Sequence, residues 1–335
     1  MAFAGCGDGN GSSAEGPVTV YASLPLTGPR AADGEAAADG ARFALEMAGG
    51  EASGIEVRLE VLDDARGAAW SPAAVGANAR AAAQDSSTAA FIGELDSEPT
   101  RTSLPITNDA EILQISPGAG GVDLTAPAQG YPDSPQRYRP SGEATFARLV
   151  ASDARTAAAA AVLAIDSALK RVRVPAVEGP YEKLVTEEFE AAAAEVGLET
   201  LRDGRGDAEL RLDRDGGFTL SPTGAGPVLA VRQQLAPQPE AESSLNVLLA
   251  DGPEESAPYA VYGYEAMELV LQAIGQAVED GGEDEFRRQV TGAVLGAQRT
   301  DSLLGPYSMG DDGEPTLCVQ PYVDGRPREP ICPGG

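Results

Sequence analysis

Two short segments, each following a predicted strand, carry residues suited to bind the charged head of a small molecule. Ser97 starts a predicted helix, so its hydroxyl and the unpaired backbone N–H groups of the first helical turn can bind a carboxylate. Serine is also a common helix N-cap, and the two roles are compatible. Gly118, Ala119 and Gly120 form a small-residue turn that exposes backbone N–H and C=O groups to a ligand. A carbonyl there can accept from an ammonium group, so the two segments together suit a zwitterion.

The absence of histidine limits the chemistry that the chain can perform. The sequence of 335 residues contains no His, which excludes Ser-His and Cys-His catalytic pairs and imidazole–metal sites. Carboxylate, lysine and tyrosine chemistry stay open, but no coherent nucleophile accompanies them. We therefore expect no enzyme, no cofactor and no metal site.

The charge of the chain argues against polyanionic partners. Its 52 acidic residues outnumber 24 Lys and Arg, for a net charge of −28. Such a surface repels nucleic acid and anionic membrane surfaces, so neither is expected as a partner. A solvated acidic face is the simplest explanation of the excess.

Two of the three cysteines predict a disulfide bond. Cys318 and Cys332 lie close together in a tail rich in Pro and Gly. A bond between them would close a short loop and contribute about 3 kcal/mol. Pairing fits an extracytoplasmic location, whereas two free thiols are the alternative.

The third cysteine lies near the N-terminus. Cys6 follows Phe3-Ala4-Gly5 and precedes a polar tether, which resembles the end of a bacterial lipoprotein signal whose Cys is lipidated. Phe3 replaces the usual Leu, and the charged and apolar parts of a signal are absent. The alternative is a chance Cys in a tail. No run of about 20 apolar residues for a membrane span occurs.

Predicted strands and helices alternate along the chain, as in α/β proteins with parallel sheets. The expected strands cover residues 18–24, 55–62, 89–92, 112–115 and 172–177, and the helices cover 34–48, 69–83, 97–108, 144–164, 181–196, 259–278 and 283–298. The alternation of strand and helix patterns weakens between 201 and 257, where only 228–231 and 245–249 suit strands. Two short strands are expected in the tail. Trp70 is interpreted as packing.

This pattern, with 42% hydrophobic residues, predicts two α/β lobes, each a parallel sheet flanked by helices, the second reduced. Residues 1–16 form a lipobox remnant and tether. The restart of the pattern predicts that a second lobe begins near residue 139.

Several motifs together carry a family resemblance. They are Leu24-Pro25-Leu26-Thr27-Gly28, Asp63-Asp64, Phe91-Ile92-Gly93 before Ser97, the segment 112–118, the helix from Tyr259 and Gly305-Pro306-Tyr307. The chain resembles type I periplasmic substrate-binding proteins of the branched-chain amino acid uptake group. The resemblance implies two lobes that close on a ligand like a hinged clamp and deliver it to the membrane permease of an ABC importer. It also implies that the chain returns to the first lobe, so that lobe 1 comprises 17–138 and 257–302, and lobe 2 comprises 139–256 and 303–335.

The resemblance also assigns candidate ligand-binding residues. Ser97 matches the family's ligand-binding serine, and Gly118 and Ala119 lie where the family uses backbone atoms. Gly120 lies where a hydroxyl-bearing Thr or Ser is frequent, so one head-group contact is missing or comes from water. Tyr181 fits the second-lobe tyrosine that covers the ligand, with core packing as the alternative.

Two further positions complete this set. Asp33 lies where many members have an aromatic residue near the ligand, although a helix cap is the alternative interpretation. An acidic partner for the ligand's ammonium is expected between residues 200 and 257, where no residue can be assigned.

The resemblance therefore implies an extracytoplasmic solute-binding protein, anchored to the membrane through lipidated Cys6 in the full-length precursor, that binds an amino acid or a similar small zwitterion. A sensory or interaction module with the same fold, no longer serving transport, is the alternative that the weak second-lobe pattern suggests.

Overall fold

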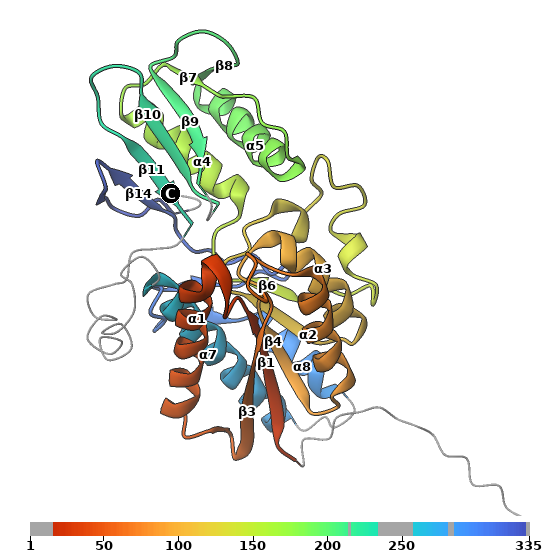
Figure 1. The fold of residues 1–335 in the computed structure, drawn as a ribbon. Coiled ribbons are helices and arrows are strands. Elements are labelled where there is room, and N and C mark those ends of the chain that lie inside the picture. Colours follow the sequence, from red (N-terminus) through yellow and green to blue (C-terminus); the bar gives the residue numbers. More distant parts are fainter. Residues whose placement is uncertain (1–15, 214–215, 234–256, 281–284, 333–335) are drawn as a thin grey trace, which may run out of the picture.

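Two α/β lobes are stacked along the long axis of the molecule (Figure 1). The structure, a computed structural model, describes residues 16–213, 216–233, 257–280 and 285–332. The first lobe contains both the N-terminal strands and the helices that follow residue 256, so the chain passes between the lobes more than once.

A six-stranded sheet forms the centre of lobe 1, in the order β2-β3-β1-β4-β5-β6. All neighbours are parallel except the short β2, which forms an antiparallel hairpin with β3. Every residue of β1 is buried, as expected for a parallel strand covered on both faces. The bounds are β1 Val18–Leu24, β2 Glu51–Ala52, β3 Ile55–Asp63, β4 Thr88–Ile92, β5 Leu113–Ser116 and β6 Phe146–Arg148.

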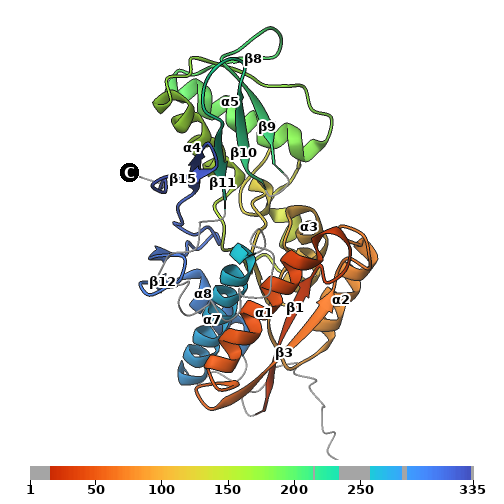
Figure 2. The same cartoon turned by 60° about the vertical axis from the view of Figure 1, so that its left-hand side comes forward.

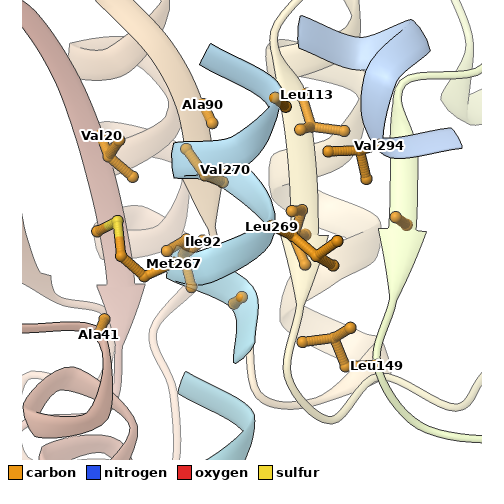
Figure 3. Packing of buried hydrophobic residues seen from close by; sticks show 14 of the residues in the cluster. Val20, Ala41, Ala90, Ile92, Leu113, Leu149, Met267, Leu269, Val270 and Val294 are labelled. Carbon is orange, nitrogen blue, oxygen red and sulfur yellow. The ribbon is translucent and has the colours of Figure 1, made fainter. Parts of the chain in front are cut away.

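Helices cover both faces of this sheet (Figure 2). Helices α1 (Ala31–Met47), α7 (Ala257–Asp280) and α8 (Phe286–Leu295) cover one face, where Met267 and Val270 of α7 pack against Val20 and Ile92 (Figure 3). Helices α2 (Pro72–Gln84) and α3 (Ser97–Asp109) cover the other. The strand carboxyl ends therefore stay open toward lobe 2.

Lobe 2 contains a seven-stranded sheet with the order β15-β14-β11-β10-β9-β7-β8. Only the β7–β8 and β7–β9 pairs are parallel, so most of this sheet is antiparallel. Its core includes the stacked rings of Phe189 and Phe218, 5.8 Å between centroids. The bounds are β7 Arg171–Arg173, β8 Glu199–Leu201, β9 Ala208–Leu212, β10 Phe218–Pro222, β11 Leu229–Arg232, β14 Gln320–Val323, β15 Arg326–Pro327, α4 Asp153–Asp166 and α5 Pro180–Val196.

The predicted helix over residues 144–164 is wrong at its N-terminal end. Phe146–Arg148 instead forms β6, which pairs with β5, and α4 begins only at Asp153. The short apolar run around Phe146 joins an alanine-rich segment, and periodicity alone cannot separate a buried strand from a buried helix in such a run. Leu149 and Val150 still pack in the core of lobe 1, so the chain leaves this lobe after Val150 rather than at residue 139.

The last passage between the lobes is also later than predicted. After α8, the hairpin of β12 (Gln298–Arg299) and β13 (Tyr307–Ser308) stays with lobe 1, and Leu317 still packs in the core of that lobe. The chain enters lobe 2 only at β14. Residues 303–317 therefore belong to lobe 1, because their apolar side chains are buried there.

A disulfide bond joins Cys318 and Cys332 across a sequence separation of 14 residues. It connects the last passage between the lobes to the segment after β15, where Val319 and Ile331 form a β-bridge. Cys6 and the predicted strand 245–249 lie outside the described residues. No helix in the described ranges is long and apolar enough to cross a membrane.

Candidate functional site

A cavity of about 390 Å³ lies between the lobes at the open strand ends of lobe 1. This volume is at the small end of the range for small-molecule sites. Lobe 1 contributes Arg30, Trp70, Asp96, Ser97, Glu98, Gly118 and Gly120, and lobe 2 contributes Tyr181, Glu182, Val185, Leu212, Asp213, Gly216, Gly217 and Gln233.

Ser97 joins the two strand ends on which the site was predicted. It is the first residue of α3, and Asp96 is the N-cap. The Ser97 Oγ accepts a hydrogen bond from the Gly121 N–H at 2.8 Å. A hydroxyl that accepts in this way keeps its own hydrogen to donate, so Ser97 can still contact an anion in the cavity.

Most polar groups of the β5 turn are used within the protein. Ser116 Oγ accepts from the Gly118 and Ala119 N–H groups, at 3.2 and 2.8 Å. The carbonyl of Gly120 accepts from the Asp153 N–H at 2.8 Å. Among the described residues, the Gly118 carbonyl and the Gly120 N–H have no hydrogen-bond partner, and both residues line the cavity. One acceptor and one donor therefore remain for a ligand.

Ala119 lies apart from the cavity. It is fully buried in a cluster with Leu104, Leu124, Tyr138 and Phe146. Its carbonyl accepts from Arg148 Nη1 at 3.0 Å. The structure therefore brings Gly118 and Gly120 to the cavity but directs Ala119 into the core.

Arg148 is a structural residue of the turn that the sequence did not reveal. It is fully buried, and its Nη2 donates to the Gly121 carbonyl and to Thr125 Oγ1, at 2.9 and 2.8 Å. Glu314 lies 3.1 Å from the same nitrogen. Two carbonyls of the turn are thus held by one guanidinium, which sets the path of the backbone beside the cavity.

Asp33 does not line the cavity but contacts Arg30, which does. Its carboxylate accepts from Arg30 Nε at 2.8 Å, while Arg30 Nη1 contacts both oxygens of Asp96 at 2.5 and 2.7 Å. Arg30 Nη2 donates to the Tyr259 hydroxyl at 2.9 Å. Burial lowers the pKa of Arg30, but Asp96, Tyr259 and Asp33 raise it by more, so the guanidinium stays charged. Its charge is already balanced by two carboxylates.

Tyr181 of α5 lies at the junction of the lobes. Its ring centroid is 5.7 Å from the Arg101 guanidinium of lobe 1, and Arg101 is bound by Asp123 at 2.8 and 2.6 Å. Burial and the neighbouring Asp153 raise the pKa of the Tyr181 hydroxyl well above its usual value. Tyr181 therefore remains neutral and forms part of the cavity wall.

Two buried carboxyl groups, those of Asp64 and Glu94, lie just after the ends of β3 and β4. Glu94, two residues after the end of β4, is fully buried, and its Oε2 accepts from Ser23 Oγ at 3.0 Å. Burial raises the pKa of Asp64 to about 6, and burial together with the charge of Asp64 raises that of Glu94 well above its usual value. Two close carboxyl groups in such a setting share a proton.

Sequence reasoning placed only Ser97, Gly118, Gly120 and Tyr181 of the cavity wall at the site, and Trp70, Asp213 and Gln233 are among the wall residues that it missed. Trp70, interpreted as packing, lies in the cavity wall. Asp213 follows β9 within the region where no acidic residue could be assigned, and its Oδ2 accepts from Thr219 Oγ1 at 2.7 Å. Gln233 follows β11. Strand β9, which ends just before Asp213, was not predicted, so the sequence distinguished neither Asp213 nor Gln233. No described residues form a group of three or more His, Cys, Asp or Glu able to hold a metal ion.

Comparison with known proteins agrees with this arrangement. A profile of the family described as periplasmic binding protein matches residues 17–207. The chain belongs to the periplasmic binding protein family. The predicted resemblance to type I members and the two-lobed α/β class are thereby confirmed.

Solved structures of this periplasmic binding protein family share the fold at low sequence identity. A leucine binding protein from Thermotoga maritima has a TM-score of 0.70 and 19% identity, covering 94% of this chain and 99% of that one. A solute binding protein of an ABC transporter from Rhodopseudomonas palustris, in complex with 3,4-dihydroxybenzoic acid, has a TM-score of 0.69 and 14% identity over 94% and 96%. A substrate-binding protein from Desulfitobacterium hafniense in complex with Leu has a TM-score of 0.65 and 14% identity over 93% and 99%. No curated protein sequence matches the chain.

Proposed function

We propose that this periplasmic binding protein is an extracytoplasmic solute-binding protein that captures a small zwitterion, an amino acid or a close relative. The ligand is held between the lobes and delivered to the permease of an ABC importer, and the protein performs no catalysis. The full-length precursor is anchored through lipidated Cys6.

The head-group geometry supports a zwitterion. The Ser97 hydroxyl, the Gly120 N–H and the N-terminus of α3 offer donors at the cavity and suit a carboxylate. The Gly118 carbonyl and the Asp213 carboxylate supply acceptors for an ammonium group. Donors and acceptors thus converge on one small cavity.

The charged residues of the cavity wall favour an amino acid over a simple anion as the ligand. Among the described residues, the wall has one cation, Arg30, against the carboxylates of Asp96, Glu98, Glu182 and Asp213. Arg30 is already paired twice. Three of these carboxylates are themselves ion-paired, Asp96 with Arg30, Glu98 with Arg101 and Asp213 with Arg211. The described wall therefore offers no unpaired cation to a plain carboxylate such as a benzoate, whereas its carboxylate and carbonyl oxygens can accept from an ammonium group.

Calorimetry with the purified protein tests the proposal. The probes are the common amino acids together with benzoate and 4-hydroxybenzoate, and circular dichroism verifies that the protein is folded. We expect binding of at least one amino acid and none of the benzoates. A folded protein that binds no amino acid, or binds a benzoate more tightly, contradicts the proposal.

The alternative is a sensory or interaction module with this fold. The largely antiparallel sheet of lobe 2 is the observation that favours it. Uptake into vesicles that carry the permease separates the two functions, because only a transport protein stimulates accumulation of the amino acid that it binds.

A further inference from the structure

Gly120 is a glycine because a side chain from the other lobe fills its place. A Cβ atom at this position would lie 2.0 Å from Gln233 Nε2 and 2.6 Å from Asp153 Oδ1. Both contacts are far closer than real Cβ atoms allow. The space that a serine or threonine at position 120 would use is therefore occupied by the amide of Gln233.

The orientation of this amide is fixed. Gln233 Nε2 donates to Asp153 Oδ1 at 2.6 Å, and Asp153 is fully buried. Burial raises the pKa of Asp153 to about 6, so the side chain is ionised at pH 7.5 and can only accept hydrogen bonds. The amide nitrogen must therefore face Asp153, and the amide oxygen must face elsewhere.

The oxygen is left for the cavity. Gln233 has only 1% of its surface exposed, yet it lines the cavity beside Gly216, whose Cβ position lies 2.8 Å from both Oε1 and Nε2 of Gln233. Within the part of the chain that the structure describes, no hydrogen bond reaches this oxygen. It thus joins the Gly118 carbonyl and the Asp213 carboxylate as an acceptor at the cavity.

We propose that Gln233 Oε1 accepts a hydrogen bond from the ammonium group of the ligand, with Asp153 as the positioning residue that fixes the amide. This inference rests on the proposed function and identifies a specificity-determining residue of that site. The second lobe thereby supplies the polar contact that Gly120, which has no side chain, cannot make.

The first test compares ligands with and without the ammonium group. Calorimetry at pH 7.5 uses L-leucine, L-glutamine and L-arginine, each beside the carboxylic acid that lacks its α-amino group. For an amino acid that binds, we expect Gln233→Met to weaken affinity about ten- to a hundred-fold, as for a hydrogen bond to a charged group. Affinity for the acid without the amino group changes less than threefold. Gln320→Met, at another buried glutamine of the same sheet, is the control and leaves both affinities unchanged.

A second variant tests the same proposal in case Gln233→Met fails to fold. Asp153→Asn keeps the size of the side chain but can donate as well as accept, so the Gln233 amide is free to turn. We expect its discrimination between each amino acid and the corresponding acid to fall between those of the wild type and Gln233→Met. Discrimination equal to the wild type overturns the positioning role of Asp153.

The third test asks whether Gln233 replaces a hydroxyl at position 120. Gly120→Ser alone must displace the Gln233 amide and lose affinity, while Gly120→Ser with Gln233→Ala frees the space and regains at least tenfold. No regain overturns the replacement. If the wild type binds an amino acid and Gln233→Met still discriminates as strongly between that amino acid and the acid without the amino group, the role of Gln233 is overturned but the proposed function stands. Failure of the wild type to bind any amino acid overturns both.

Discussion

Removal of the Ser97 hydroxyl tests the junction of the two strand ends. In Ser97→Ala, the Gly121 N–H loses the acceptor that lies 2.8 Å away, in a residue with 7% exposure. A buried donor without a partner costs about 1–3 kcal/mol of the free energy of unfolding. The ligand carboxylate also loses a donor, and a hydrogen bond to a charged group contributes about 1.5–3 kcal/mol, or roughly ten- to a hundred-fold in Kd.

A matched serine separates the two effects. Ser103 lies on the same helix, is fully buried and accepts from Gln114 Nε2 at 2.8 Å, but it does not line the cavity. Ser103→Ala is therefore expected to lose a similar free energy of unfolding in urea titrations, with unchanged Kd. Calorimetry with an amino acid that the wild type binds completes the comparison. If Ser97→Ala changes Kd by less than threefold, Ser97 does not bind the carboxylate and the reasoning is refuted.

Three further predictions concern the scaffold around the cavity. Glu94→Gln removes a carboxyl group whose pKa is raised in the folded state, so its protonated form stabilises the fold at low pH and this stabilisation is lost as pH rises through the folded-state pKa. In urea titrations between pH 5 and 8, we therefore expect the wild type to lose stability relative to the variant, by at most about 1.4 kcal/mol per pH unit. Parallel stability curves for the two proteins contradict this prediction. Arg101→Met leaves the fully buried carboxylate of Asp123 without its cation, which costs about 3–5 kcal/mol of the free energy of unfolding measured in urea. The double variant Arg101→Met with Asp123→Asn regains much of this stability, and a cost below about 1 kcal/mol in the single variant contradicts the prediction. Gly40→Ala places a Cβ atom 1.9 Å from a carbonyl oxygen of α7 and is expected to cost about 1–3 kcal/mol or more of stability in thermal unfolding. The control Gly292→Ala, which has open space around the new Cβ atom, does not destabilise the protein, and equal effects of the two substitutions refute the argument.

The first lobe was largely predictable because its strands are buried on both faces. Such strands are short apolar runs followed by polar turns, and the predicted 18–24 coincides with β1. The same property caused the error at β6, since Phe146, Ala147 and Arg148 are fully or almost fully buried within an alanine-rich stretch. There the pairing with β5 decided the structure, and pairing is not a local property of the sequence.

The site was predictable only where strand ends determine it. Ser97, Gly118 and Gly120 meet because the carboxyl ends of neighbouring parallel strands open on the same edge of a sheet. Trp70 and Gln233 reach the cavity through tertiary contacts that no spacing in the sequence encodes. Their contributions therefore required the folded arrangement of both lobes.

The glycine at position 120 shows why a missing side chain is not evidence of a missing contact. Viewed alone, Gly120 weakens the expected head-group site. In the folded chain it admits Gln233 from the opposite lobe, which Asp153 holds in one orientation. A contact supplied by a lobe-1 hydroxyl would exist whether the lobes are open or closed. A contact supplied by Gln233 exists beside Gly120 only when the lobes are together, so the substitution couples recognition of the ammonium group to closure of the clamp.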